Sequence, residues 1–174
     1  FIHNGIVAGG GRVYCLDKLP FSVEEKLRRR GLLEENTYRV IAVDAKTGAP
    51  QWEKTDKVFG TWMSYSEKHD ILLQAGARAS DRLPDEVGGG IAAYRGKDGS
   101  TVWEDLERRY SGPCILHNDM VLTNAVSYQK SSGAFSLFDG SPHVITNPIT
   151  GKSEPWQFIR TYGCNTAIAS EHLL

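Results

Sequence analysis

Three acidic side chains, Asp81, Asp85 and Glu86, lie close together in the sequence and could bind a divalent cation. Carboxylate oxygens are ligands that calcium prefers, but calcium loops place them at regular, alternating positions. Here the spacing is irregular, and Leu83 and Pro84 interrupt it. The sequence therefore predicts a solvated acidic loop, and we assign no metal ligands.

The five histidines form no pattern typical of a metal or catalytic site. His3, His69 and His172 fall at corresponding turns of a repeat, where they would stand too far apart to share a metal, and His117 and His143 are isolated. We expect these side chains to serve in turns or to contact solvent. Serine, histidine and aspartate all occur, but without a Gly-x-Ser-x-Gly nucleophile motif, so no catalytic residues are assigned.

Two glycine runs, 9–11 and 88–90, lack the spacing of phosphate-binding loops and are interpreted as turns. The basic run 28–30 is interpreted as a solvated helix end. These segments therefore add no expected ligand.

The three cysteines, Cys15, Cys114 and Cys164, form no Cys-x-x-Cys pair, which argues against a zinc site or a c-type haem. Cys114 and Cys164 lie fifty residues apart, at corresponding places in neighbouring repeats. Such positions usually exceed the roughly 7 Å between Cα atoms that a disulfide tolerates, so we expect free thiols. Cys15 is predicted to be a buried strand residue, and Cys164 is the better candidate to pair with a cysteine outside this chain.

Composition indicates an ordinary folded domain. The 174 residues are 40% hydrophobic and 24% charged, unlike a disordered chain. A net charge of −1 gives no reason to expect nucleic acid or an anionic membrane as partner. The longest apolar runs, such as 71–73, are too short for a transmembrane helix.

The most informative pattern is a repeat that ends in tryptophan. Trp52, Trp103 and Trp156 recur at intervals of 51 and 53 residues. A fixed period near fifty residues, built from strands and glycine turns, is typical of a β-propeller. We call the repeated segment that ends in each tryptophan a tryptophan phrase. The three phrases begin at Asp44, Arg95 and Asn147, and each has a glycine four residues later, namely Gly48, Gly99 and Gly151.

Each period is predicted to contain four short strands between Gly- and Asp-containing turns. The expected strands are 6–8, 12–16, 38–43 and 51–53, then 61–66, 71–75, 90–94 and 101–103, then 114–116, 120–125 and 134–138 with a close at Trp156. A fourth period would begin at 165–169. We interpret 1–174 as one partial all-β propeller domain of four-stranded antiparallel blades, with blade-like periods of about 5–70, 71–119 and 120–172.

Three insertions fall at the same connection of each period, at 18–37, 79–90 and 127–133. The first is predicted to hold a helix from Ser22 to Gly31, because Ser22 and Glu25 form a capping box and Gly31 is a natural stop. Loops at the same connection emerge on one face of a propeller. That face is the expected binding surface for a protein or glycan partner.

The segment from Ile41 to Trp52, with its Asp-Ala-Lys-Thr-Gly phrase, resembles the PQQ-like repeat of quinoprotein-type propellers. The second copy keeps Gly99 and Trp103 but has a different turn, and the third keeps Thr150-Gly-Lys152 and Trp156 but lacks the aspartate. The resemblance covers essentially the whole chain. It implies that these glycines and tryptophans are structural docking residues that join neighbouring blades: Gly48, Trp52, Gly99, Trp103, Gly151 and Trp156.

The same resemblance implies a bacterial, periplasmic or extracellular protein of more blades than three, since closed propellers carry about 4–8. The remaining blades of the same protein are then its first partners. A small repeat protein that closes through partners is the alternative. The segment 162–174 also resembles a stretch of larger PQQ-like proteins, in which the chain continues.

Two functions from different classes remain open. The leading one is a non-catalytic propeller scaffold or binding module, including the possibility of a glycan- or peptide-binding propeller. The rival is part of a PQQ-dependent oxidoreductase whose PQQ and Ca²⁺ ligands lie outside this chain. Enzymes of that kind often have adjacent cysteines, which this sequence lacks. A haem motif or adjacent cysteines elsewhere in the protein would favour the enzyme.

Overall fold

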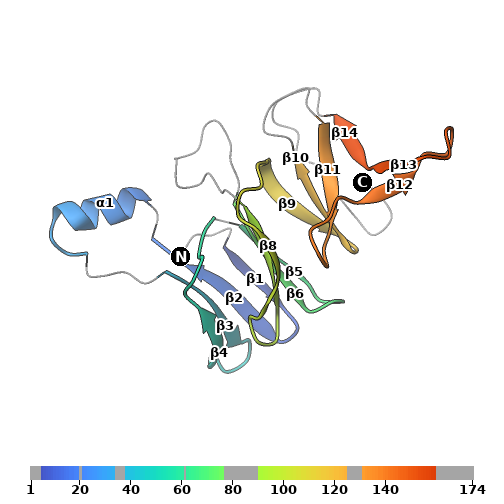
Figure 1. The fold of residues 1–174 in the computed structure, drawn as a ribbon. Coiled ribbons are helices and arrows are strands. Elements are labelled where there is room, and N and C mark those ends of the chain that lie inside the picture. The colour runs from blue at the N-terminus through green and yellow to red at the C-terminus, as the bar shows by residue number, and fades with distance from the viewer. Residues whose placement is uncertain are drawn as a thin grey trace.

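Three four-stranded antiparallel sheets follow one another along the chain (Figure 1). The computed structural model describes residues 5–19, 21–33, 38–60, 62–76, 90–124 and 131–159. The first sheet has the strand order β1-β2-β3-β4 and the second β5-β6-β7-β8, so each is a meander of consecutive neighbours. The bounds are β1 Ile6–Gly9, β2 Arg12–Asp17, β3 Arg39–Asp44 and β4 Pro50–Lys54, then β5 Trp62–Ser66, β6 Ile71–Ala75, β7 Ile91–Arg95 and β8 Thr101–Asp105.

The third sheet has the same plan with an insertion before its last strand. Its order is β9-β10-β11-β14, and a separate hairpin of β12 and β13 lies between β11 and β14 in sequence. Figure 1 shows this hairpin projecting away from the sheets. The bounds are β9 Ser111–His117, β10 Met120–Asn124, β11 Ser131–Ser136, β12 Val144–Thr146, β13 Ser153–Pro155 and β14 Gln157–Ile159.

The sheets divide the chain differently from the expected periods. The predicted boundaries at 70 and 119 fall inside hairpins, because β5 pairs with β6 and β9 pairs with β10. A new sheet therefore begins soon after Trp52 and soon after Trp103, at β5 and β9. The expected insertion 127–133 also ends earlier than predicted, since β11 begins at Ser131.

One helix, α1 (Phe21–Arg29), interrupts the first sheet between β2 and β3 and lies away from it in Figure 1. It ends as the sequence predicts: Gly31 has a φ of +67°, and the N–H groups of Gly31 and Leu32 donate to carbonyls of the last turn, each at 3.0 Å. The helix begins one residue before Ser22, so Ser22 lies in its first turn rather than at its cap.

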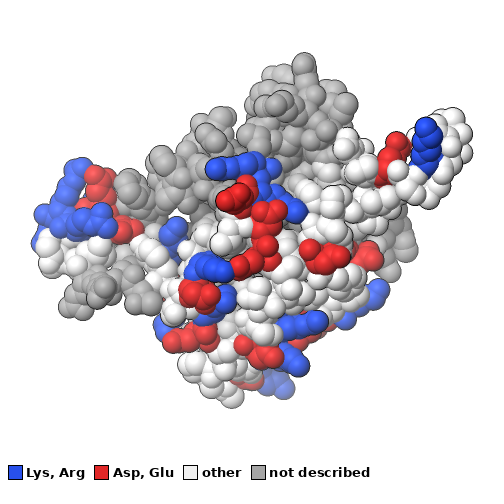
Figure 2. Space-filling view, viewed as in Figure 1, with Lys and Arg blue, Asp and Glu red and all other residues white. Residues whose placement is uncertain are grey.

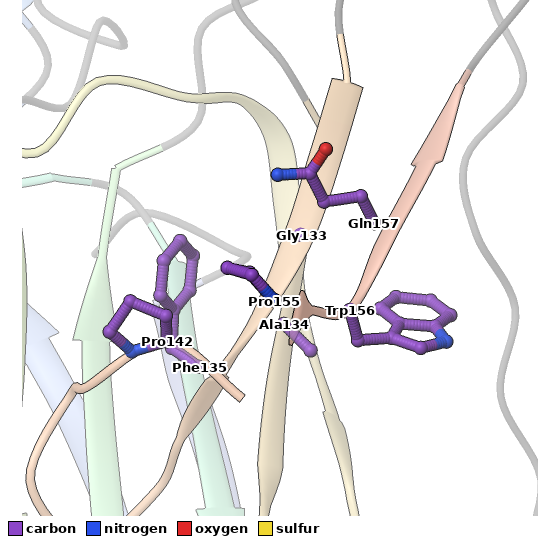
Figure 3. A pocket seen from close by; sticks show the side chains of 7 residues that line it. All are labelled: Gly133, Ala134, Phe135, Pro142, Pro155, Trp156 and Gln157. Atoms are coloured by element: carbon purple, nitrogen blue, oxygen red, sulfur yellow. The ribbon is translucent and has the colours of Figure 1, made fainter. Parts of the chain in front are cut away.

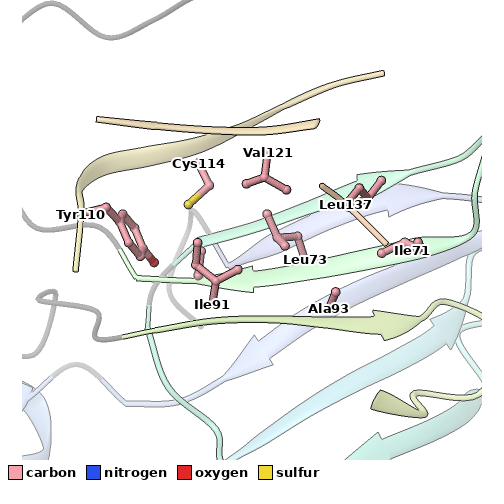
Figure 4. Close-up of a cluster of buried hydrophobic side chains, with 9 residues drawn as sticks. Ile71, Leu73, Ile91, Ala93, Tyr110, Cys114, Val121 and Leu137 are labelled. Atoms are coloured by element: carbon pink, nitrogen blue, oxygen red, sulfur yellow. The ribbon is translucent and has the colours of Figure 1, made fainter. Parts of the chain in front are cut away.

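The second sheet is covered on both faces, which explains why every residue of β6 is buried. Ile71, Leu73 and Ala75 point toward the third sheet, in the cluster of Figure 4, while Leu72 packs against the first sheet. This alternation follows from the two-residue period of a strand. The core is thus two apolar layers, one at each junction between consecutive sheets.

The first strands of the three sheets are neighbours, since β1 contacts β5 and β5 contacts β9. Sheets that pack face to face with their first strands side by side have the arrangement of propeller blades. The described residues therefore form an all-β fold of consecutive β-propeller blades. No helix among them is long and apolar enough to cross a membrane.

Candidate functional site

One turn recurs at the end of the third strand of every sheet. Its glycine donates to the carbonyl four residues before it, at 2.9 Å in Gly48, 2.8 Å in Gly99 and 2.9 Å in Gly140. The three glycines have φ of +72°, +71° and +69°, a left-handed conformation that residues with a Cβ rarely adopt. The turn therefore needs glycine at this position in each sheet.

Two of these turns hold a tryptophan from the preceding sheet. Trp52 of the first sheet donates its indole N–H to the Gly96 carbonyl at 2.8 Å, and its ring covers Gly99. Trp103 of the second sheet donates to the Leu137 carbonyl at 2.7 Å, and its ring covers Gly140. A Cβ added at either glycine would lie 2.7 Å from the Cε3 atom of the indole.

Each occupied turn is also braced by the preceding hairpin of its own sheet. The Gly96 N–H donates to the Asp70 carbonyl, and the Leu137 N–H donates to the Asp119 carbonyl, both at 2.8 Å. The brace fixes the carbonyl that receives the indole. We call the turn glycine, the receiving carbonyl and this brace together the indole socket.

The third tryptophan keeps its position, whereas its glycine does not. Gln157 pairs with Gly133, which places Trp156 beside Ala134. Trp52 and Trp103 lie opposite the corresponding alanines, Ala42 and Ala93, in their own sheets.

Gly151, which the sequence assigned to the third phrase, lies instead at the turn of the inserted hairpin between β12 and β13. No described atom lies within 4 Å of a Cβ built there. Gly140 occupies the corresponding place in the third sheet. Its Asp139-Gly-Ser141 sequence matches Asp98-Gly-Ser100, a signal that could have identified it.

The fourth tryptophan, Trp62, had no predicted role. Its indole N–H donates to the Cys114 carbonyl in the third sheet at 3.1 Å and also contacts the Ser64 hydroxyl at 3.2 Å. Trp52, Trp62 and Trp103 therefore all donate to a backbone carbonyl of the next sheet. None of the three is fully buried; each is half-buried.

A polar cluster lies at the junction of the first and second sheets. The Tyr65 hydroxyl donates to Asp70 at 2.7 Å, and the Arg12 guanidinium contacts the same carboxylate at 3.3 Å. The Tyr14 and Tyr65 rings lie 5.0 Å apart. Burial, together with the Asp70 carboxylate, raises the pKa of Tyr65, so the phenol stays protonated as a donor. The cluster joins the first sheet to the second.

Two further buried networks are paired in the same way, whereas the buried His69 Nε2 and Arg108 Nη1 atoms have no hydrogen-bond partner among the described residues. The Tyr94 hydroxyl donates to Gln74 at 2.9 Å, and Gln74 donates to the Phe59 carbonyl at 2.8 Å. Tyr110 receives the Gly76 N–H at 2.6 Å and donates to the Gly90 carbonyl at 2.7 Å. Burial raises the pKa of both tyrosines. These side chains satisfy backbone groups at sheet ends rather than forming a reactive site.

The two described cysteines are free thiols. Cys114 is buried in the layer between the second and third sheets, and this burial raises its pKa to about 12. Cys15, which was expected to be buried, is only half-buried because its face of the first sheet is incompletely covered. Cys164 lies outside the described residues, so its state remains a prediction.

The described histidines stay apart. His69 contacts Phe138 edge-on, with ring centroids 4.9 Å apart, at the junction of the second and third sheets. His117 contacts Asn118 at 3.3 Å. His143 lies on the chain that leads into the β12–β13 hairpin, where its backbone pairs with Ala134 and Trp156.

No group of three or more His, Cys, Asp or Glu side chains within the described ranges could hold a metal ion. His3, His172, Asp81, Asp85 and Glu86 lie outside those ranges.

A shallow hollow of about 290 Å³ lies at the last strand of the third sheet. Figure 3 shows Phe135 and Pro142 at one side and Trp156 at the other, and its seven lining residues include no acid, base or nucleophile. On the face in Figure 2, acidic and basic side chains are interspersed. Neither feature marks a catalytic centre.

The fold and the sockets define a class: consecutive β-propeller blades joined by indole docking. No protein-family model matches the sequence, and no curated protein matches it. Among solved structures, the chain is similar to a europium-containing methanol dehydrogenase, with 13% identity over 81% of this chain and 25% of that one, at a TM-score of 0.47.

Two further solved structures are similar at the same level. The quinohemoprotein alcohol dehydrogenase ADHIIG from Pseudomonas putida HK5 matches with 12% identity over 78% of this chain and 19% of that one, at a TM-score of 0.47. BamB from Moraxella catarrhalis matches with 12% identity over 74% of this chain and 34% of that one, at a TM-score of 0.44. The chain thus corresponds to 19–34% of the length of these three proteins.

Proposed function

We propose that this chain is a non-catalytic propeller scaffold or binding module whose blades are held in register by indole docking. The observation that carries this proposal is the use of Trp52, Trp62 and Trp103, each of which donates to a carbonyl of the following sheet. An indole buries a large apolar surface and satisfies its single donor in one contact, so it suits a joint between sheets.

The polar side chains of the described residues support the same function. Asp70, Gln74 and Tyr110 each accept from or donate to groups at sheet ends or sheet junctions. A catalytic acid or base needs access to a substrate and a tuned pKa. Here three of the strongly shifted groups, Tyr94, Tyr110 and Cys114, are enclosed in the layers between sheets, and the fourth, Tyr65, is partly buried and donates to Asp70, which favours structural roles.

In this proposal the docking residues are Trp52 with Gly99 and Trp103 with Gly140, and Trp156, directly before β14, is the third docking tryptophan. Gly48 belongs to the same set through its turn, whereas Gly151 lacks a tryptophan among the described residues. The binding surface is the face that carries the insertion 18–37 with α1, joined by 79–90 and 127–133. A protein or glycan would bind there, in a periplasmic or extracellular compartment.

Titration with pyrroloquinoline quinone, with and without Ca²⁺, tests the proposal. We expect no saturable change in quinone absorbance at micromolar concentrations. Because Asp81, Asp85 and Glu86 could supply calcium ligands, the titration is repeated on a variant with all three changed to asparagine or glutamine. Micromolar binding by the unchanged chain would overturn the scaffold proposal and favour an oxidoreductase whose quinone ligands lie within this chain rather than outside it. Loss of that binding in the variant would place the calcium ligands at Asp81, Asp85 and Glu86.

A further inference from the structure

Four side chains converge on Gly96 at the junction of the first and second sheets. The Trp52 indole N–H donates to the Gly96 carbonyl at 2.8 Å. A Cβ built at this glycine would collide with Asp70 Oδ1 and would lie 2.6 Å from the Tyr14 hydroxyl and 2.8 Å from the Tyr65 ring. Glycine is therefore required here for space, because only a residue without a Cβ leaves room for these side chains.

The three aromatic rings of this cluster form a continuous series. The Tyr14 ring neighbours both others, with its centroid 6.0 Å from that of Trp52 and 5.0 Å from that of Tyr65. Tyr14 is fully buried, whereas Trp52 and Tyr65 are half-buried. Indoles and phenols lose one electron more easily than most other side chains, and electron transfer between them weakens steeply with distance. An electron can therefore pass from Tyr65 to Trp52 through the enclosed ring of Tyr14.

Tyr65 also has a base in direct contact with its hydroxyl. The Tyr65 hydroxyl donates to Asp70 Oδ1 at 2.7 Å. A phenol that loses one electron becomes a very strong acid, so its oxidation needs a group that takes up the proton at once. A carboxylate accepts such a proton, whereas a side-chain amide is a much weaker base. The Tyr94 hydroxyl, at the same junction, donates to the amide of Gln74 and lacks this advantage.

Asp70 is held in place for this contact. Its carboxylate lies 3.3 Å from Arg12 Nη1, which is also 3.5 Å from the Tyr14 hydroxyl, and it accepts from the Lys97 N–H at 3.1 Å. Arg12, Lys97 and Tyr65 thus fix both of its oxygens. The Asp70 side chain is 34% exposed, so a proton that it receives can pass on to solvent.

We propose that this cluster is a one-electron oxidation relay, with Trp52 as its entry, Tyr14 as its bridge and Tyr65 as its end. An outer-sphere oxidant, of the class of oxidised metal complexes, takes one electron from Trp52 and is itself reduced. Trp52 regains one electron from Tyr65 through Tyr14. The O–H bond of Tyr65 breaks, and its proton forms a new O–H bond with Asp70 Oδ1. The products are the reduced oxidant, a neutral Tyr65 phenoxyl radical and a protonated Asp70.

The relay is independent of the scaffold function and adds to the part that the same side chains play in joining the sheets. A thiolate that gives one electron to the phenoxyl radical restores the resting state, because the proton returns from Asp70 to Tyr65. The thiolate becomes a thiyl radical. The relay thus moves an oxidising equivalent away from the Trp52 joint to a residue that small reductants can repair.

Photo-oxidation with flash-generated tris-bipyridine ruthenium(III) tests the relay. Transient absorption and electron paramagnetic resonance of rapidly frozen samples follow the radicals. We expect a tryptophan radical first and a tyrosyl radical that grows as it decays. Tyr65→Phe should remove most of this tyrosyl signal and prolong the tryptophan radical. Tyr14→Phe should do the same, because it keeps a ring in the core but removes the oxidisable bridge.

Two further variants test the proton acceptor and the specificity. Asp70→Asn should slow tyrosyl formation, because it removes the base but retains the size and tolerates the φ of +50° at this position. Tyr94→Phe is the matched control and should leave both radicals unchanged. Tyr38→Phe is a second control, because the Tyr38 hydroxyl donates to the Glu24 carboxylate outside the Gly96 cluster.

The outcomes separate the relay from simple packing. Differences between the unchanged chain and each folded variant isolate Tyr65, since the remaining aromatic side chains are common to both. Equal tyrosyl yield in Tyr65→Phe and in the unchanged chain would overturn the relay. Loss in Tyr65→Phe but not in Tyr14→Phe would show direct oxidation of Tyr65 and overturn the entry at Trp52. An unchanged rate in Asp70→Asn would overturn its role as the proton acceptor. None of these results bears on the quinone titration.

Discussion

At the scale of single residues, the tryptophans make the hydrogen bonds and ring contacts that join neighbouring sheets. Trp103 places its ring on Gly140 and its N–H on the Leu137 carbonyl, and the Arg108 guanidinium lies 5.9 Å from the ring. Removing the ring leaves a carbonyl without its donor and a gap beside the glycine. Both effects act on the same junction, between the second and third sheets.

We therefore expect Trp103→Ala to lower the free energy of unfolding by about 3 kcal/mol, the lower end for a large aromatic truncation because the ring is half-buried. Urea denaturation of both proteins measures this change in the free energy of unfolding. Val144→Ala, at a 53% exposed side chain on the projecting hairpin, is the control and should change stability by less than about 0.5 kcal/mol. A loss below about 1 kcal/mol for Trp103→Ala would refute the docking role.

The thiols provide a second test at this scale. Burial raises the pKa of Cys114 to about 12, so near pH 8 it is both protonated and enclosed. In a Cys164→Ser background, Cys15 should react with a thiol reagent in the native protein, and Cys114 only as the protein unfolds. Reaction of both thiols at one rate would contradict this placement of Cys114.

The residue scale also shows where sequence reasoning succeeds. The tryptophans were identified because their spacing and chemistry are visible in the sequence, and the structure places Trp52 and Trp103 at the same register position of their sheets. Gly140 was missed because the inserted hairpin carries its own Thr150-Gly-Lys152 turn, which imitates the repeat more closely. Pairing decides between two similar turns, and a single sequence does not display pairing.

At the scale of elements, the recurring glycine turn is the unit that the sequence predicts best. All four copies have a left-handed glycine, so substitution by alanine costs about 1–2 kcal/mol of backbone strain in each. The copies differ in what the new Cβ meets. Gly99→Ala and Gly140→Ala should therefore destabilise more than Gly48→Ala and Gly151→Ala, because only the first pair collides with an indole.

Thermal unfolding of the four alanine variants checks this order. Equal decreases in melting temperature in all four variants would show that backbone strain alone causes the destabilisation. A larger decrease in melting temperature for Gly151→Ala than for Gly99→Ala would contradict the assignment of the docking contact to Gly99.

The same turns make stability depend on pH. Hydrogen bonds lower the pKa of Asp98, chiefly from the Ser100 hydroxyl, and of Asp139, chiefly from the Ser141 backbone N–H. A carboxyl whose folded pKa is depressed stabilises the fold above its unfolded pKa, about 3.9, and this contribution disappears as pH falls through the folded pKa. Stability should therefore decline below about pH 4.

Asp98→Asn with Asp139→Asn should flatten that acid decline, measured by denaturant midpoints between about pH 5 and pH 2. The corresponding Ser variants, Ser100→Ala and Ser141→Ala, should flatten it less, because each leaves backbone donors in place. An unchanged pH profile in the double variant would contradict the role of these carboxylates.

At the scale of the whole molecule, the main contacts between the described sheets join the first to the second and the second to the third. Strand positions and the single helix were predictable because alternation and turn residues are local signals. The boundaries between sheets were not, since the hairpins at 70 and 119 look like the links between sheets. The insertion of β12 and β13 was invisible for the same reason: a hairpin that belongs to no sheet has the local pattern of one that does.

Neighbour-only contacts predict uneven responses to a core mutation. Leu73 is fully buried in the layer facing the third sheet. Leu73→Ala should reduce hydrogen-exchange protection in β10 more than in β2, although all three sheets share one chain. Leu72→Ala, its neighbour on the opposite face, should show the reverse preference. An equal loss of hydrogen-exchange protection in β2 and β10 in both variants would show that the three sheets open as one cooperative unit.

The meander order of the sheets has a mechanical consequence. In the first and second sheets the first and last strands lie at opposite edges, and every neighbour is antiparallel. Tension applied along the chain would load these edges so that hydrogen bonds open one after another, as in a zipper, instead of sharing the load in shear. The molecule should be compliant when stretched, and its resistance should come from the indole joints rather than from the sheets.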